Sequence, residues 1–301
     1  ADWADAKTYA KKVIDSPYKL YTAKKGQWSA YQQLFMGDNG ENGSSVEAIF
    51  PILQDGKKTT SWGTTLFLMA GCNDNKERVK SATEKGNNTT EGWAGNRMRP
   101  DLVQKFFPNN DAPNISAYAM PAAADDDRAL FDGDGRNVTN GDDENGVKVF
   151  TNGFSVCKFN NFKTDGSAGH DSKFPDADFF LMRAAEAYLM YAEADARQNG
   201  GTTTADGAKY INELRSRAHA TTYTAYSLRQ ICDEWSREFY FEGLRRTTLI
   251  RFGYFGGNVN YNWSWKGGVK NGRNFDAHFN LFPIPTSDLT ANGNLAQNPG
   301  Y

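Results

Sequence analysis

The stretch DFFLMRAAEAYLMYAEA, residues 178–194, decides the fold. Its Ala, Leu, Met and aromatic residues predict one helix that extends over 178–198. Alanines let neighbouring helices approach closely, and large side chains such as Leu181 and Tyr188 fill most of the remaining directions. We therefore expect a largely buried helix with a single narrow polar stripe that includes Arg183.

Further helices are predicted on both sides of this stretch. After it, a helix covers 205–219, and another opens at the capping box SLRQ (227–230), with Gly243 as its C-cap and a short helical piece after it. Before it, helices near 2–15 and 27–35 form an αα-hairpin of the tetratricopeptide type. The fold class is mainly α, with helical hairpins, a long loop-rich insertion and few short strands.

Periodicity is lost between the two helical regions, where Gly, Asn, Asp and Thr cluster. Short strands are expected near 47–53 and 147–158, and a short helix follows Pro100. A loop-rich stretch this long is usually functional. We expect four segments: a helical hairpin at 1–50, a loop-rich ligand-binding insertion at 51–175, helical hairpins at 176–255, and an extended tail packing on the scaffold at 256–301.

Composition excludes several classes of protein. The chain has 301 residues, 39% of them hydrophobic and 23% charged, with a net charge of -2. There is no basic excess for binding nucleic acid, and no run of 18 apolar residues that would span a membrane. The three cysteines, Cys72, Cys157 and Cys232, are too few and too scattered for a disulfide framework or a zinc site, and Cys232 is expected in the core.

Three glutamates at i,i+4 spacing, Glu234, Glu238 and Glu242, allow two interpretations. Glu238 and Glu242 are candidates for the paired carboxylates of a glycoside hydrolase. The favoured interpretation is a structural ion network, because like charges on one helix face repel unless they are neutralised. The arginines placed to neutralise them are Arg237, Arg245, Arg246 and Arg251. The sequence contains no HExxH, nucleophile elbow, P-loop or dinucleotide fingerprint, which argues against an enzyme.

Two Asp-rich turns, DDDR at 125–128 and DGDGR at 132–136, resemble pieces of calcium-binding loops. The second fails the EF-hand spacing because Arg136 stands where the fifth position requires an oxygen ligand. No cofactor is predicted, and a calcium site built from separated loops remains an alternative.

Tryptophans in polar, Gly-rich loops are the candidate binding residues. Trp62 lies in TTSWGTT, Trp93 in EGWAGN, and Trp263 and Trp265 lie close together near the C-terminus. A sugar ring offers an apolar C–H face for an aromatic ring and a hydroxyl rim for amide groups. For each tryptophan singly a plug over the core is favoured, but we expect at least one to face a ligand. Trp62, Trp93 and Asn96 are the predicted contacts.

The motifs together resemble the SusD/RagB family. FLMRAAEAYLMYAEA resembles the RxAExxLxYAEA helix of that family, and SREFYFEGLRR resembles its ERxxEfxfEGxR, with Ser236 where Glu is usual. Further matches occur in order along the chain: GWAGN (92–96), PDLVQKF (100–106), YINELRSRA (210–218), LIRFG (249–253), FPIP (282–285) and QNPGY (297–301). Trp93 lies in one of these motifs, so its role there can also be structural.

The resemblance implies a glycan-binding protein of the cell surface. Members of the family are lipoproteins of the outer membrane in Bacteroidetes-type bacteria, and they pass nutrients to a SusC-type TonB-dependent transporter. They are binding proteins, not enzymes, and a peptide- or protein-binding relative on the same scaffold is a further alternative. Family members carry a lipidated cysteine and a long N-terminal region before the first matched residue. We therefore expect the N-terminal portion of the same protein to be a partner that completes the site.

Overall fold

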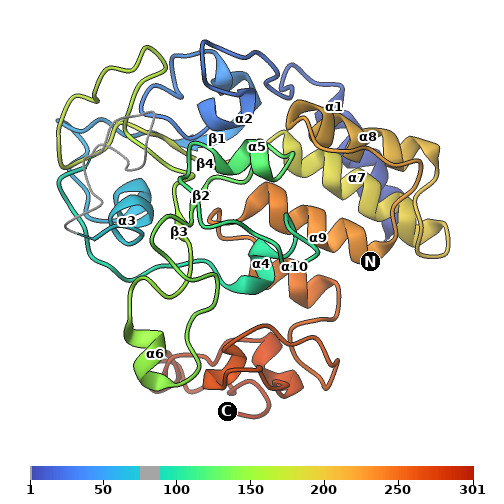
Figure 1. Cartoon of the computed structure of the whole chain (residues 1–301). Coiled ribbons are helices and arrows are strands. Elements are labelled where there is room, and N and C mark those ends of the chain that lie inside the picture. Colours follow the sequence, from blue (N-terminus) through green and yellow to red (C-terminus); the bar gives the residue numbers. More distant parts are fainter. Residues whose placement is uncertain (1, 75–88) are drawn as a thin grey trace. The chain divides into compact units, whose positions relative to one another are not determined.

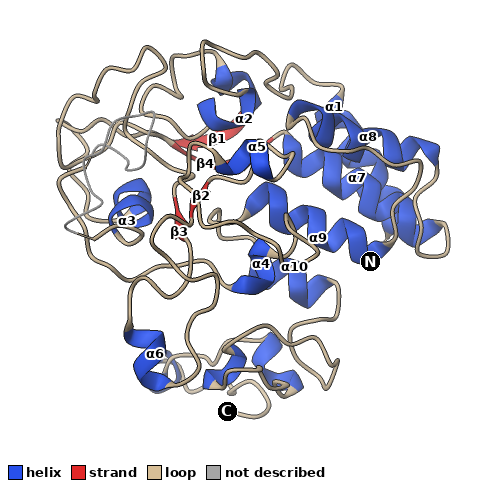
Figure 2. Cartoon of the chain, in the orientation of Figure 1, coloured by secondary structure: helices blue, strands red, loops and turns tan. Residues whose placement is uncertain are grey.

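The computed structural model describes residues 2–74 and 89–301; part of the predicted insertion, 75–88, lies outside the described residues. Contacts within the chain divide it into two compact units, Ala1–Glu242 and Gly243–Tyr301. The regular secondary structure of the described residues is mostly helical, with short paired strands and long loops, as predicted (Figure 2). Within them, no helix is both long and apolar enough to cross a membrane.

Four helices of the first unit form what we call the helical frame: α1 (Trp3–Ile14), α7 (Ala185–Gln198), α8 (Ala205–Arg217) and α9 (Leu228–Phe239). The helix α7 packs against each of the other three (Figure 1). The first helix of the chain therefore lies on a helix that follows it by 171 residues, as counted from Ile14 to Ala185. The alanines of α7 are buried, as the small side chains of this stretch predict.

The helix α9 begins as its sequence predicts. Ser227 accepts a hydrogen bond from the N–H of Gln230, and the Gln230 side chain accepts from the N–H of Ser227. Such a cap stabilises a helix by about 1 kcal/mol. Cys232 lies in the buried face, also as predicted. The helix ends at Phe239, however, so the predicted cap Gly243 lies beyond its end, in a turn where its φ is 82°.

The first unit contains further short elements outside the frame. They are α2 (Ala30–Gln33), η1 (Ser44–Glu47), α3 (Thr64–Ala70), α4 (Pro100–Val103), α5 (Met120–Ala123), α6 (Glu144–Lys148), and the strands β1 (Ala48–Ile52), β2 (Phe131–Asp132), β3 (Ser155–Val156) and β4 (Phe179–Arg183). The strands form two antiparallel pairs, β1 with β4 and β2 with β3. The predicted strand near 147–158 is wrong at its start, which belongs to α6, and right at β3.

The prediction that a helix starts at residue 178 is wrong. Residues 179–183 form β4, with Ile52 opposite Phe179 and Ala48 opposite Arg183, and the helix starts at Ala185. The backbone groups of this segment pair with a strand that precedes it by more than 120 residues, which helical periodicity does not report. As a result Arg183 leaves the predicted polar stripe and becomes completely buried.

Two apolar clusters lie beside the frame in the first unit. One gathers residues from α2, the two paired strands β1 and β4, and the segment around Phe159, with Tyr31, Leu34 and Phe35 at its centre. The other surrounds the pair β2–β3, where Phe131 stacks on Phe154. These two clusters are the apolar cores against which the short elements outside the frame pack.

The second unit consists of short helical elements joined by extended segments. Its helical elements are α10 (Arg245–Arg251), η2 (Lys266–Gly268), η3 (Ala277–Asn280) and α11 (Thr286–Ala291). The Gln297 side chain bonds both the N–H and the C=O of Ile284, so the FPIP and QNPGY motifs hold each other. Trp263 and Trp265 are partly buried in this unit.

Candidate functional site

The helix α3 organises a surface cluster of aromatic side chains. Its inner face, which includes Leu66 and Met69, is buried, and the hydroxyl of Thr65 donates to the C=O of Ala177 at 2.9 Å. Phe67 lies on its outer face and is 50% exposed. Trp62 lies just before the helix and is 55% exposed.

The loop that carries Trp93 is fastened to the C-terminus of α3. The last carbonyl groups of a helix lack partners within it, and other groups must satisfy them. Here the N–H of Trp93 donates to the C=O of Ala70 at 2.8 Å, and the N–H groups of Gly95 and Asn96 donate to the C=O of Gly71 at 2.9 and 2.6 Å. Trp93 is thereby held beside the helix, where it is 38% exposed.

The rings from these segments form the aromatic cluster, defined as Trp62, Phe67, Trp93 and Phe174. The centroids of the two indoles are 6.3 Å apart and their planes are tilted by 30°. Phe67 approaches Trp93 at 6.1 Å, and Phe174 meets Trp62 edge-on at 5.4 Å. The result is a row of ring faces that remains open to solvent at Trp62, Phe67 and Trp93.

Besides α3 and the loop of Trp93, the turn at 171–174 borders the cluster. The carboxylate of Asp171 accepts the N–H groups of Lys173 and Phe174 at 2.7 and 3.0 Å. These hydrogen bonds lower the pKa of Asp171 below its ordinary value. The turn places the Lys173 ammonium 5.1 Å from the centroid of the Trp62 ring.

The structure brings two of the three predicted site residues together. Trp62 and Trp93 are both exposed, so for these two the plug interpretation is wrong. Asn96 is partly buried, and its side chain lies against Gly71, where an added Cβ would come within 2.5 Å of the amide nitrogen. Phe67 and Phe174 also belong to the cluster, although they were not among the predicted contacts. An apolar, helix-length run at 64–70 was the available signal for Phe67.

Candidate metal ligands lie nearby. One ligand atom each from Asp55, His170 and Asp176 falls within 4.8 Å of the others. Both oxygens of Asp176 already accept backbone N–H groups, from Gly56 and His170, at 2.8 Å each.

The Asp-rich turns of the sequence have protein partners. Asp126 pairs with Arg128 at 2.8 Å, and Asp132 accepts the N–H of Ala117 at 2.9 Å. A calcium site built from separated loops stays an alternative to the prediction of no cofactor.

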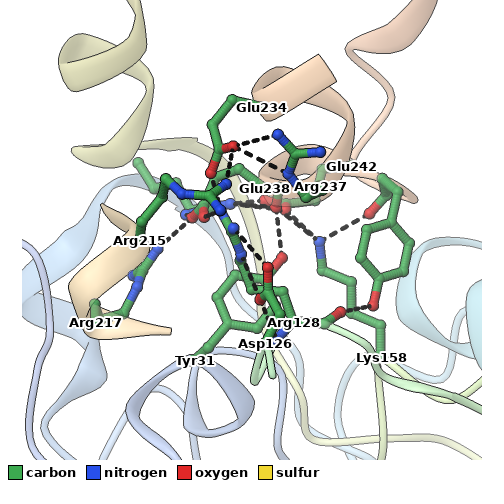
Figure 3. Close-up of polar contacts among 12 residues, drawn as sticks. Tyr31, Asp126, Arg128, Lys158, Arg215, Arg217, Glu234, Arg237, Glu238 and Glu242 are labelled. Carbon is green, nitrogen blue, oxygen red and sulfur yellow. Dashed lines mark hydrogen bonds and ion pairs between the residues drawn. The ribbon is translucent and has the colours of Figure 1, made fainter. Parts of the chain in front are cut away.

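The three glutamates of α9 and the turn after it lie in a buried ion network (Figure 3). Its members come from distant parts of the first unit: Glu47, Asp126, Arg128, Lys158, Arg183, Arg215, Arg217, Glu234, Arg237, Glu238 and Glu242. The single side chain of Arg183 pairs with three glutamates, Glu47, Glu238 and Glu242, at 2.8, 2.7 and 2.7 Å. The predicted network is confirmed, and so is Arg237, which pairs with Glu234 at 2.6 Å. Arg245, Arg246 and Arg251 belong to the second unit.

The surroundings of Glu238 and Glu242 do not suit acid–base catalysis. Burial by itself raises the pKa of Glu238, but the guanidinium groups of Arg217, Arg183 and Arg128 lower it well below its ordinary value. A general acid in glycoside hydrolysis requires a raised pKa and access to substrate. Glu238 is completely buried, and Glu242 is 7% exposed and bonded to Lys158 and Arg183. The hydrolase alternative therefore loses its proposed pair.

Comparison with known proteins identifies similar chains. The sequence pattern of the SusD family matches residues 131–301. The starch-binding protein SusD of Bacteroides thetaiotaomicron is 41% identical over 332 residues, which cover 100% of this chain and 56% of that protein. The chain thus spans little more than half the length of this relative.

Solved structures show the same fold. A SusD superfamily protein from Parabacteroides distasonis superposes with a TM-score of 0.60 at 18% identity, over 99% of this chain and 57% of that one. Surface glycan-binding protein A from Bacteroides thetaiotaomicron, in complex with laminarihexaose, gives a TM-score of 0.56 at 20% identity, over 98% and 59% of the two chains.

Proposed function

The chain belongs to the SusD family, and from that premise we propose that it captures an oligosaccharide or polysaccharide on the aromatic cluster. The observation that carries the proposal is the pair of exposed indoles, Trp62 and Trp93, 6.3 Å apart. Large exposed aromatic side chains that sit side by side commonly mark a binding surface. An indole covers the C–H face of a sugar ring, and the polar groups around it meet the hydroxyl rim.

The proposed ligand class is a neutral glucan. The relative with 41% identity is a starch-binding protein, and a more distant structural neighbour holds laminarihexaose. The 30° tilt between the two indoles suits a chain whose successive rings turn relative to each other. An α-linked glucan of the starch type is therefore the first ligand to test, and a β-linked laminarin oligosaccharide is the second.

The proposed setting is the cell surface. As part of a SusD-family protein, the chain would act at the outer membrane beside a SusC-type TonB-dependent transporter, to which captured glycan passes. This chain matches 56% of the starch-binding relative. We propose that an N-terminal portion of the same protein, equivalent to the unmatched part of that relative, supplies further ligand contacts. Affinity of this chain for glycan is expected to be modest, because an open, wet site gains little beyond its stacking and hydrogen bonds.

The test is a calorimetric titration of the chain with three probes: maltoheptaose, laminarihexaose and a mixed tetrapeptide library. The proposal predicts saturable binding of at least one glucan and no heat from the peptides. Binding of peptides without either glucan would support a peptide-binding relative on the same scaffold and overturn glycan capture. The appearance of shorter sugars during a long incubation would revive hydrolysis as an activity.

A further inference from the structure

Two charged side chains link the indoles of the aromatic cluster. The indole N–H of Trp93 donates to one carboxylate oxygen of Glu91 at 3.1 Å. The other oxygen of Glu91 lies 3.5 Å from the ammonium of Lys173. That ammonium lies 5.1 Å from the centroid of the Trp62 ring, which itself faces Trp93. Trp93, Glu91, Lys173 and Trp62 therefore form a ring in which each side chain contacts the next.

The backbone holds the two charged residues in place. The N–H of Thr90 donates to the C=O of Ser172 at 2.7 Å, and the hydroxyl of Thr89 donates to the C=O of Lys173 at 3.0 Å. Glu91 and Lys173 thus belong to two segments that are joined beside the cluster. Their contact follows from this pairing rather than from two long side chains that meet by chance in solvent.

These contacts act on side chains that would otherwise be mobile. An exposed indole must be immobilised when it stacks on a ligand, and the loss of its freedom opposes binding. A hydrogen bond donated by the indole N–H and a cation over a ring each favour one orientation of the side chain. Contacts of this kind shift the ordering cost from the binding step to folding.

The charges of the pair also bear on the ligand. The Lys173 side chain is 40% exposed and the Glu91 side chain 22% exposed, so both border the open faces of the rings. An unpaired ammonium at this place would attract carboxylated or sulfated sugars. Because Glu91 opposes it, the pair itself adds one charge of each sign to the border of the cluster.

We propose that Glu91 and Lys173 are positioning residues that hold Trp62 and Trp93 in their mutual tilt before the ligand arrives, and that their pairing restricts the cluster to uncharged glycans. This inference rests on the proposed function, since it concerns the same site. Lys173 and Glu91 need not touch the sugar; they act through the two rings.

The first experiment needs no ligand. Two indoles this close give an exciton couplet in circular dichroism. The substitution Trp93→Phe removes this couplet, so the difference between its spectrum and that of the wild type gives the size of the couplet. Glu91→Ala is expected to lose most of that couplet, and Lys173→Met a smaller part, with thermal unfolding unchanged. Lys57→Met, which removes an exposed lysine of a neighbouring loop, is the matched control and should keep the couplet. A full couplet in Glu91→Ala overturns the positioning role.

The second experiment uses ligands. Maltoheptaose and an oligogalacturonate of similar length are titrated into the protein at low and high salt. Glu91→Gln keeps an acceptor for the Trp93 indole but leaves Lys173 without its counter-charge. It is expected to bind maltoheptaose about threefold more weakly and to gain salt-sensitive binding of the anionic probe. Lys173→Arg is expected to restore nearly wild-type binding of maltoheptaose, in contrast to Lys173→Met.

The outcomes separate this inference from the proposed function. Wild-type protein that binds no glycan overturns the proposed function, whatever the couplet shows. Wild-type protein that binds maltoheptaose, with the same affinity in Glu91→Ala and Lys173→Met, overturns the positioning role alone. Wild-type protein that prefers the oligogalacturonate overturns the restriction to uncharged glycans.

Discussion

The buried ion network and the aromatic cluster belong to the same unit but obey opposite rules. The network places charged groups largely out of contact with water, so each of them needs a partner of opposite sign. Glu238 and Arg183 are completely buried in it. The cluster leaves apolar rings where water does reach them, with Trp62 and Phe67 at least half exposed. Loss of a partner is therefore costly in the network, whereas loss of a ring should leave the fold almost unchanged.

The residues that identify the family and the residues proposed to bind the ligand lie in different parts of the unit. The segments RAAEAY and REFYFEG, which made the family recognisable, contribute Arg183, Glu238 and Glu242 to the network. The cluster comes from α3 and the short loops around it, which carry only one of the family motifs, GWAGN. Motifs that specify the frame transfer its architecture, and the ligand contacts have to be found in the structure.

The largest expected effect comes from Arg183→Met, which leaves three buried carboxylates without their shared partner. Removing one side of a buried ion pair destabilises a protein by about 3–5 kcal/mol. We expect a loss of this size in denaturant unfolding, or failure to fold. Lys11→Met, which removes the exposed pair with Asp15, is the control and should leave unfolding unchanged. Equal unfolding of wild type and Arg183→Met would contradict the role of the network.

The next effect is acid sensitivity of the frame. The arginines around Glu234 and Glu238 outweigh the effect of burial and lower the pKa of both groups in the folded protein. An unfolded glutamate has a pKa of about 4.3, so below that pH the unfolded chain takes up protons that the folded chain does not. Unfolding free energy should therefore fall as pH drops from about 5, by up to about 1.4 kcal/mol per pH unit for each group.

Denaturant unfolding at pH 6, 5, 4 and 3 measures this dependence. Unfolding free energy that is independent of pH down to pH 3 would show that these glutamates do not have lowered pKa values.

A smaller effect is expected for the indoles. Trp62→Ala and Trp93→Ala should each weaken binding of maltoheptaose about tenfold, which corresponds to about 1.4 kcal/mol, because each removes one stacking face. Tyr118→Ala, at an exposed tyrosine in another loop, is the control. Calorimetric titration measures affinity, and thermal unfolding should be similar in all four proteins. Affinity that falls only together with the unfolding temperature would argue for a structural role.

The smallest effect is expected for Asn96→Ala. A neutral hydrogen bond contributes about 0.5–1.5 kcal/mol, so loss of a ligand contact at Asn96 should weaken binding a few-fold. The side chain also lies against Gly71, so the same titration should be paired with thermal unfolding. Unchanged affinity for both glucans would remove Asn96 from the predicted ligand contacts.

Local signals in the sequence were sufficient for some of this structure. The capping box at Ser227 needs only four residues, 227–230, and α9 starts where it predicts. The buried alanines of α7 follow from helical spacing. In contrast, β4 forms because β1 is available as a partner, and no pattern within 178–194 reports that partner. Tertiary pairing overrode the local preference there.

The candidate site was predictable in its residue types but not in its geometry. Trp62 and Trp93 stand out as rings among polar residues, yet their contact depends on the loop at 93–96 binding the end of α3. The network shows the same limit: the spacing of the glutamates predicts that they need cations, and Arg237 is local to them. Arg128 is separated from Glu234 by 106 residues in the sequence and Lys158 from Glu242 by 84, so local spacing cannot reveal these pairs.

The most direct test of glycan capture on the aromatic cluster is a crystal structure of this chain with maltoheptaose. We predict that successive sugar rings lie against Trp62 and Trp93, with the buried ion network unchanged. A glucan bound elsewhere on the chain, with both indoles still facing solvent, would contradict it.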